Sequence, residues 1–255
     1  MMMTMMAAQM RVAGGEPDPD AQSVLANLIS WWDFEQASGF SFTDSHGSNH
    51  LTTQVGVGGI STDSGKVGRS TAFSGSTDFT YMDNSSSFAF GNESFTVFLW
   101  HYPVSGEPTT ACIASKYFVT GDQRSYDLTR SSTGNFAVSL SSDGSSITMH
   151  QGPAKSPVDT AFNFLAFGYN AATDKGFLIV DGVRSEFTHA GGVYAASTAQ
   201  FCIGARRSNV NTVAVVGFGR HDSSGVISTA ITDAEYAVLY NAGAGLNYAG
   251  LVALT

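Results

Sequence analysis

Residues 65–82 read Gly65-Lys66-Val67-Gly68-Arg69-Ser70-Thr71-Ala72-Phe73-Ser74-Gly75-Ser76-Thr77-Asp78-Phe79-Thr80-Tyr81-Met82. The stretch predicts a turn, a short strand, a tight turn and a second strand, because glycine recurs where the backbone must bend or adopt positive φ. Phe73, Phe79 and Tyr81 are the apolar side chains that we expect to anchor these strands. The chain before the stretch predicts an arm and one strand, and the chain after it predicts a long series of strands.

The composition is that of a globular, β-rich domain. Of the 255 residues, 43% are hydrophobic and only 13% are charged, against about 25% charged in an average domain. A chain of this length can bury a full core without disulfides or metals, and we expect no cofactor and no metal site. The net charge of −9, with no basic cluster larger than Arg206-Arg207, argues against nucleic-acid binding. No run of about 18 apolar residues occurs, so we expect no transmembrane helix and no membrane partner.

The middle of the chain predicts successive antiparallel strands. Residues 95–102 are apolar on both faces, which is typical of a central strand that is covered on both sides. Asp181-Gly182 lies between two apolar runs and predicts a two-residue hairpin turn with positive φ at both positions. Further strands are predicted at 28–35, 111–118, 125–130, 135–140, 146–150, 162–169, 176–180, 200–204 and 212–219.

One strong helix is predicted near the C-terminus. Thr232 has the sequence context of an N-cap, and Glu235 stands three residues later, which completes a capping box. An apolar stripe follows, and Gly243 is expected to end the helix. Many strands, a single late helix and no alternation of strands with helices together predict an antiparallel two-sheet sandwich.

Residues 1–27 differ from the rest of the chain. The segment from Gly14 to Asp20 is expected to break any regular structure, and Arg11 follows the apolar run, which does not fit a signal peptide. We interpret residues 1–27 as an extended arm that docks soft methionine side chains on a partner. The alternative is a disordered tail, part of it upstream of the true start codon. The expected partner-binding residues are Met1, Met2, Met3, Met5, Met6 and Met10.

The two cysteines, Cys112 and Cys202, each lie in an apolar, strand-like run. They are interpreted as two small buried thiols. One disulfide between them is the alternative, since the sequence does not give their separation.

Six segments of the chain, taken together and in their order, carry a resemblance to a known family. They are Leu28-Ile29-Ser30-Trp31-Trp32-Asp33-Phe34-Glu35 with Ala37-Ser38-Gly39, Asp44-Ser45-His46-Gly47-Ser48-Asn49, the 65–81 stretch, Ser94-Phe95-Thr96-Val97-Phe98-Leu99-Trp100, Val180-Asp181-Gly182, and Ile231-Thr232-Asp233-Ala234-Glu235 leading to Leu239-Tyr240-Asn241-Ala242-Gly243. Over residues 28–248 the chain resembles the laminin-G-like, concanavalin-A-like jelly-roll superfamily. The resemblance implies an all-β, antiparallel two-sheet jelly roll, with one short C-terminal helix and an extended N-terminal arm.

Within that superfamily, the closing Leu-Tyr-Asn-Ala-Gly-Ala-Gly-Leu and the short N-terminus resemble copies found in tailed-phage virion proteins, which decorate capsids or tails. Two departures stand out. Family members usually carry a Trp where Phe162-Asn163-Phe164 stands, and an acidic pair where this chain has Val213-Ala214-Val215-Val216-Gly217. The second departure weakens any calcium or ligand role carried over from the family.

The sequence offers no catalytic set. Glycoside hydrolysis needs two carboxylates across the scissile bond, and although Asp33 and Glu35 share a face of the first predicted strand, they end it at a turn. His46 and His50 lie in a polar loop rather than on a helix, so they are expected to be solvated rather than to bind a metal. Trp31 and Trp32 are candidates for stacking on a sugar ring, with at least one of them expected in the core.

These observations predict residues 1–27 as an arm and 28–255 as a jelly-roll domain. The leading hypothesis is a non-enzymatic virion structural protein, a capsid decoration protein of a bacteriophage. Its expected partners are the major capsid protein or another virion protein, further copies of itself in a homo-oligomer, and cell-surface glycans. The alternative is a secreted, extracellular carbohydrate-binding module of the lectin type. A glycan hydrolase is disfavoured, because paired carboxylates are missing.

Overall fold

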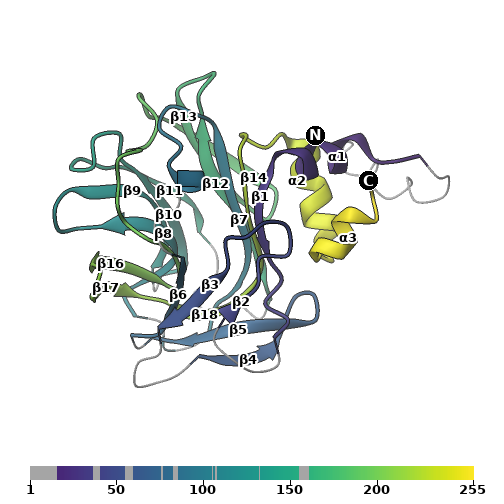
Figure 1. The fold of residues 1–255 in the computed structure, drawn as a ribbon, viewed down its shortest axis with the longest axis horizontal. Coiled ribbons are helices and arrows are strands. Elements are labelled where there is room, and N and C mark those ends of the chain that lie inside the picture. Colours follow the sequence, from purple (N-terminus) through teal and green to yellow (C-terminus); the bar gives the residue numbers. More distant parts are fainter. Residues whose placement is uncertain are drawn as a thin grey trace.

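The computed structural model describes residues 16–36, 41–54, 60–75, 77–82, 86–104, 106, 108–131, 133–154 and 161–255. Within these ranges the chain forms two β-sheets that stack as a sandwich, with α-helices on the outer face of one sheet (Figure 1). The strands pair antiparallel, except for one parallel bridge between β16 and β8. The predicted all-β jelly-roll sandwich is therefore confirmed.

The first sheet has eight strands among the described residues, in the order β14-β13-β12-β7-β18-β5-β4, and β1 also pairs with β18. The bounds are β1 Leu28–Trp32, β4 Ser61–Ser64, β5 Arg69–Ser74, β7 Phe95–Tyr102, β12 Asn163–Asn170, β13 Lys175–Val180, β14 Val183–Thr188 and β18 Phe218–Ile227.

The second sheet has ten described strands, in the order β11-β10-β9-β8-β15-β6-β3-β2, with the hairpin β16–β17 attached at β8. The bounds are β2 Ser41–Phe42, β3 Leu51–Gln54, β6 Phe79–Met82, β8 Thr110–Phe118, β9 Gln123–Ser131, β10 Asn135–Leu140, β11 Thr148–Ala154, β15 Phe201–Ile203, β16 Ala205–Asn209 and β17 Thr212–Val216.

Two apolar layers hold this arrangement together. The main core lies between the sheets, and a second layer lies between the eight-stranded sheet and the helices. Strand β7 contributes to both layers, because Phe95 faces the main core and Phe98 and Trp100 face the helices. This confirms the prediction of a central strand that is buried on both faces.

The stretch at residues 65–82 crosses from one sheet to the other. Gly65 and Gly68 close the turn between β4 and β5, with the Gly65 N–H donating to the Gly68 carbonyl at 2.9 Å. Strand β5 belongs to the eight-stranded sheet, whereas β6 belongs to the ten-stranded sheet. Phe73 packs in the main core, but Phe79 and Tyr81 belong to a separate small cluster that covers the outer face of the second sheet.

The helical layer is larger than the sequence predicts. Besides α2 (Asp233–Tyr240), the structure contains α1 (Pro19–Asn27) and α3 (Tyr248–Val252). The predicted arm at residues 1–27 is therefore wrong at its C-terminal end, because α1 packs Ala21 and Val24 into the second apolar layer. Asp18 caps α1 by accepting from the Asp20 and Ala21 N–H groups. None of the helices in the described ranges is long and apolar enough to cross a membrane.

Two local predictions are confirmed. The Thr232 hydroxyl accepts from the Glu235 N–H at 3.1 Å, and the Glu235 carboxylate accepts from the Thr232 N–H at 2.7 Å. Helix α2 then ends at Tyr240, where Asn241 adopts a left-handed conformation, rather than running on to Gly243. The hairpin turn between β13 and β14 has φ of 46° at Asp181 and 85° at Gly182.

Candidate functional site: a pocket on the outer face of the ten-stranded sheet

The helices cover one side of the sandwich, and the opposite side is the outer face of the ten-stranded sheet (Figure 1). On that face, side chains alternate along each strand. Met82 of β6 and Phe201 of β15 point into the main core, so their neighbours Tyr81 and Cys202 point outward. Together with Phe79, these outward residues form an apolar floor.

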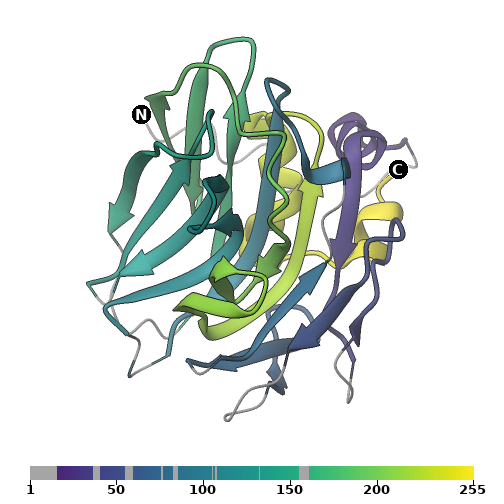
Figure 2. The same ribbon diagram turned by 60° about the vertical axis from the view of Figure 1, so that its left-hand side comes forward.

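The hairpin β16–β17 lies over this floor. Figure 2, which turns this side of the molecule forward, shows the hairpin in green across the front of the sheet. Gly204 lets the chain leave β15 and enter β16, because its φ is +82° and a Cβ there would lie 2.6 Å from the Phe73 ring. The Arg207 and Ser208 carbonyls accept from the Val119 and Thr120 N–H groups at 3.3 and 2.9 Å, which fixes β16 against the end of β8.

A pocket of about 250 Å³ lies between the hairpin and the floor. Its most unusual residue is Arg207, whose side chain is only 4% exposed. The guanidinium carbon lies 4.8 Å from the centre of the Phe79 ring, 5.6 Å from Tyr81 and 5.6 Å from Phe118. Nε and Nη1 of Arg207 are buried and have no hydrogen-bond partner among the described residues. The lining residues are Thr77, Phe79, Arg207, Val210, Asn211 and Val213.

The preceding residue, Arg206, has a different environment. Its Nη1 lies 3.0 Å from Oδ2 of Asp127, and its guanidinium stacks over Tyr117 at 5.2 Å. Burial raises the pKa of Asp127, and the Arg206 charge opposes that rise. A bulge between Arg206 and Arg207 separates their side chains. One arginine of the pair is therefore neutralised, and the other faces the pocket without a carboxylate partner among the described residues.

A family model of the concanavalin A-like lectin/glucanases superfamily (Laminin_G_3) matches residues 74–235, which is more than half of the chain. The chain belongs to the concanavalin A-like lectin/glucanase superfamily. The matched range includes every residue that lines the pocket. No curated protein sequence matches the chain.

Solved structures share this lectin-like fold at low sequence identity. The binding domain of Paraclostridial Mosquitocidal Protein 1 superposes with a TM-score of 0.67 at 12% identity, over 86% of this chain and 53% of that one. Domain 4 of AbnA, a GH43 extracellular arabinanase from Geobacillus stearothermophilus, in complex with arabinotriose, gives a TM-score of 0.60 at 18% identity, over 82% and 96%. The ligand binding domain of botulinum neurotoxin serotype D, in complex with N-acetylneuraminic acid, gives 0.62 at 10%, over 88% and 52%. The chain thus spans about half the length of these toxin domains, and at such identities the similarity shows the fold alone.

The structure corrects the hypothesis that Trp31 and Trp32 stack on a sugar. Trp31 is 1% exposed and Trp32 is fully buried. They point to opposite faces of β1, so Trp31 packs under the helices and Trp32 packs in the main core. Their indole N–H groups donate to Asp33 Oδ1 and to the Asn49 carbonyl. Neither ring presents a face to a ligand in this lectin-like domain.

The acidic pair at the end of the first strand has structural partners. Strand β1 ends at Trp32, and Phe34 has a φ of 57°, so Asp33 and Glu35 do not share a strand face as predicted. Asp33 accepts from the Ser45 hydroxyl at 2.9 Å and from the Tyr248 N–H at 2.8 Å, which ties β1 to α3. Glu35 accepts from the Arg69 N–H at 3.1 Å.

A carboxylate that sequence reasoning missed lies beside Glu35. Asp222 is fully buried, and its Oδ2 accepts from the Lys66 and Val67 N–H groups at 2.7 and 2.9 Å. Burial raises the pKa of Asp222 to about 7, and the Glu35 charge adds to the rise. Because no surface of Asp222 is accessible, a glucan cannot reach it. These two hydrogen bonds show that Asp222 holds the Gly65–Gly68 turn in place.

The loop that contains His46 and His50 is also organised by an aspartate. Asp44 accepts from four backbone N–H groups, and these outweigh its burial and lower its pKa. His50 Nδ1 accepts from the Asp44 N–H at 3.0 Å, and His46 lies beside the Tyr248 hydroxyl at 3.2 Å. In the part of the chain that the structure describes, no group of three or more His, Cys, Asp or Glu side chains is placed to hold a metal ion.

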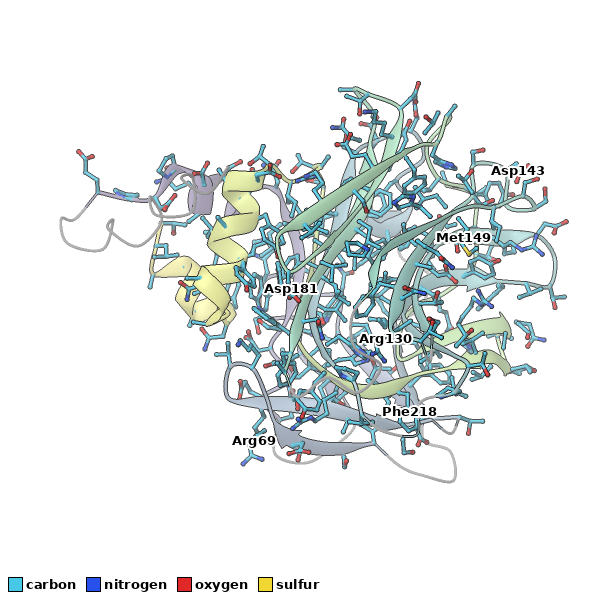
Figure 3. All side chains as sticks on the ribbon, turned by 180° about the vertical axis from the view of Figure 1, so that it is seen from behind. Arg69, Arg130, Asp143, Met149, Asp181 and Phe218 are labelled. Carbon is cyan, nitrogen blue, oxygen red and sulfur yellow. The ribbon has the colours of Figure 1, made fainter. Side chains whose placement is uncertain are left out.

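A second polar group lies inside the sandwich. Arg130, His101 and His221 are fully buried (Arg130 is labelled in Figure 3), and the two imidazole rings are 5.0 Å apart. Burial lowers the pKa of His221 to about 3 and lowers that of His101 well below its ordinary value. The His221 ring is therefore neutral at physiological pH, burial also disfavours the charged form of His101, and the group lies inside the sandwich, out of reach of a ligand.

The cysteines that the sequence singles out are described by the structure, whereas the N-terminal methionines are not. Cys112 and Cys202 are both buried free thiols, which confirms the first interpretation. Burial raises the pKa of Cys202 to about 12, and the Arg207 charge opposes that rise. Met1, Met2, Met3, Met5, Met6 and Met10 lie outside the described residues. The pocket itself was missed, and its only signal in the sequence was the Arg206-Arg207 pair.

Proposed function

We propose that the protein is a non-catalytic binding module that recognises a saccharide in the pocket beneath the β16–β17 hairpin. The observation that carries this proposal is the pocket itself. It combines the apolar side chains of Val210 and Val213 with a few polar groups, from Arg207, Asn211 and Thr77, above the buried Phe79 ring, and such a mixture is the usual composition of small-ligand sites. The lectin/glucanase family and the arabinotriose complex of the similar AbnA domain support a saccharide as the ligand.

The absence of catalysis is part of the proposal. Hydrolysis of a glycosidic bond needs an acid and a second carboxylate on either side of the bond. Asp33 and Asp222 are occupied by backbone and side-chain donors, and Asp222 is inaccessible. Asp127 is fully buried beneath Arg206. These carboxylates support a structural role.

The test uses the full chain and an array of immobilised oligosaccharides. Val210 lines the pocket and is 55% exposed, and Val183, on β14 of the other sheet, is also 55% exposed. Val210→Trp fills the pocket, whereas Val183→Trp is a matched control at the same exposure. We expect Val210→Trp to lose the saccharides that the natural chain binds and Val183→Trp to retain them. Equal binding by both variants would place the site elsewhere and refute the proposal.

A second candidate function, capsid decoration, is supported by the position of the chain ends. The Asp18 N–H donates to the Leu254 carbonyl at 2.8 Å, so both described ends lie in the helical layer, opposite the pocket (Figure 1). Attachment to a capsid or other virion protein through that layer, by single copies or a homo-oligomer, would leave the pocket facing outward on a bacteriophage virion. A secreted, extracellular module has the same pocket but needs no attachment surface.

Attachment can be tested separately from saccharide binding. Purified full chain is added to phage particles from which the protein has been stripped, and bound protein is counted after sedimentation. Saturable binding that Val210→Trp leaves unchanged supports decoration through the helical side. Failure to bind particles, with saccharide binding intact, favours the secreted module.

A further inference from the structure

We infer that the pocket takes an acidic sugar, and that Arg207 receives its carboxylate. This inference rests on the proposed saccharide-binding function and names the class of its ligand. The ligand is a single uronic or sialic acid unit at the end of a glycan rather than an inorganic anion or a neutral sugar.

The first support is the state of Arg207 compared with other arginines. A buried cation without a counter-charge is costly, and it is normally paired. Arg207 is 4% exposed, yet its Nε and Nη1 have no partner among the described residues. Four other arginines of the described chain each hold a carboxylate: Arg124 with Asp122 at 3.0 Å, Arg184 with Asp233 at 2.9 Å, Arg206 with Asp127 at 3.0 Å and Arg220 with Asp63 at 3.4 Å.

The second support is the way that Arg207 is held. The rings of Phe79, Tyr81 and Phe118 surround the guanidinium at 4.8–5.6 Å. Such contacts stabilise a cation over the ring faces, but they do not satisfy the N–H donors, which lie in the plane of the guanidinium. The donors form a rigid fork that matches the two oxygens of a carboxylate. Because Nε and Nη1 of Arg207 are themselves buried, a carboxylate reaches this fork only when the side chains that cover it move.

The third support concerns the rest of the pocket. A volume of about 250 Å³ is smaller than the roughly 300–1,000 Å³ of sites for drug-sized ligands, so it accommodates one sugar unit. Val210 and Val213 offer apolar surface to the C–H face of such a unit, and Asn211 and Thr77 offer polar groups to its hydroxyls. An inorganic anion would leave both surfaces unused.

The net charge of the chain further restricts the class of acidic ligand. At −9, the long-range field of the protein repels an extended polyanion. Recognition of an acid must then act at short range, through Arg207. This favours a terminal acidic unit over a stretch of a uniformly charged polymer.

The experiment measures binding by calorimetry and by the Nε–H signal of Arg207 in the NMR spectrum of the full chain. The probes are the methyl glycosides of glucuronic, galacturonic and N-acetylneuraminic acid, each paired with its uncharged methyl ester. We expect at least one acid to bind about 10- to 100-fold more tightly than its ester, which is the effect of a charge-assisted hydrogen bond, and to shift the Arg207 signal. Sodium acetate and sodium phosphate are expected to bind more weakly than this acid.

Two sets of variants control the result. Arg207→Met should remove the preference for the acid, whereas Arg184→Met should keep it, because Arg184 stacks on Phe177 in the other sheet. Since Arg207→Met could also alter the fold, the exposed Val210 offers a second approach. Val210→Glu should weaken and Val210→Lys should strengthen binding of the acid, while Val183→Glu leaves it unchanged.

Each other outcome is decisive. Neutral sugars or esters that bind as tightly as the acids, unaffected by Arg207→Met, overturn this inference and leave the proposed function standing. Acetate or phosphate that binds as tightly as every acidic sugar makes the pocket a small-anion site, which also overturns the inference. No binding by any saccharide, acidic or neutral, overturns both the inference and the proposed function.

Discussion

Asp222 makes the stability of this domain depend on pH, and Asp222→Asn should remove that dependence. The side chain is fully buried beneath the Gly65–Gly68 turn, where Oδ2 accepts from the Lys66 and Val67 N–H groups. An asparagine amide oxygen can accept from the same two N–H groups without carrying a charge. The variant therefore mimics the protonated aspartic acid at every pH.

The sign and size of the effect follow from the raised pKa. Burial moves the pKa of Asp222 from its ordinary 3.8 to about 7 in the folded protein. The folded state therefore holds the proton more tightly than the unfolded state. The stabilisation is fully present below about pH 4 and is lost as the pH rises through about 7. Each pH unit between the two pKa values is worth about 1.4 kcal/mol, so the loss reaches about 4 kcal/mol at most.

Urea unfolding of the natural chain and of Asp222→Asn, measured between pH 4 and pH 8.5, tests this reasoning. We expect the two proteins to have similar free energies of unfolding near pH 4, and the variant to be more stable by about 2–4 kcal/mol near pH 8. Comparing the difference at each pH cancels the contributions of Asp44 and Asp127, which both proteins share. Glu35→Gln is the control for the neighbouring charge and should produce a smaller effect of the same sign. A difference that is constant across the pH range would refute the argument.

Three further predictions concern stability. Thr232→Ala removes the N-cap of α2 and should lower the free energy of unfolding by about 1 kcal/mol, whereas an unchanged thermal melt would show that the capping box is unimportant. A chain of residues 28–255 lacks α1, and its free energy of unfolding should be about 2–4 kcal/mol lower than that of residues 16–255, because two buried side chains and their partners lose their contacts. Equal urea midpoints for the two chains would show that α1 adds no stability. Gly204→Ala forces a Cβ against the Phe73 ring and should lower the free energy of unfolding by about 1–3 kcal/mol. The same variant should lose saccharide binding at the pocket. Wild-type stability and wild-type binding together would contradict the described path of the chain.

The sandwich could be predicted because its signals are local. Asp181-Gly182 specifies a hairpin turn from two residues, and Thr232 with Glu235 specifies a helix start from four. Both signals are confirmed. Likewise, the apolar run at residues 95–102 needs only its own composition to predict a strand that is buried on both faces.

Helix α1 was missed although its signals were present. Pro17-Asp18-Pro19 was interpreted as a break in regular structure, but Asp18 is an N-cap and Pro19 occupies the first turn, where a missing N–H costs nothing. The helix is stable because Val24 and Ala21 pack against α2 and α3. Nothing in residues 19–27 alone indicates that the helices that pack against them lie more than two hundred residues later in the sequence.

The pocket could not be predicted for a related reason. Arg207 acquires its surroundings from Phe79, Tyr81 and Phe118, which converge only because β6, β15 and β8 are neighbours in the sheet. The bulge between Arg206 and Arg207 then gives two adjacent arginines different surroundings. Strand order and bulges are long-range properties, whereas the sequence shows only a basic pair. Trp31 and Trp32 illustrate the opposite error, because their residue type suggested a sugar platform and their position in a twice-covered strand buried them.

The pairing of β1 with β18 also sets the order in which the molecule can form. Leu28 is opposite Ile227 in the sheet, and the Ser228 N–H donates to the Asn27 carbonyl. During synthesis, β1 therefore emerges from the ribosome long before its neighbour exists, and its two tryptophans stay uncovered until then. Closing a loop of this length costs about 5 kcal/mol of chain entropy, which must be recovered from contacts made at the end. We expect refolding on the millisecond-to-second scale typical of β-sandwiches, with the change in tryptophan fluorescence marking the last step rather than the first.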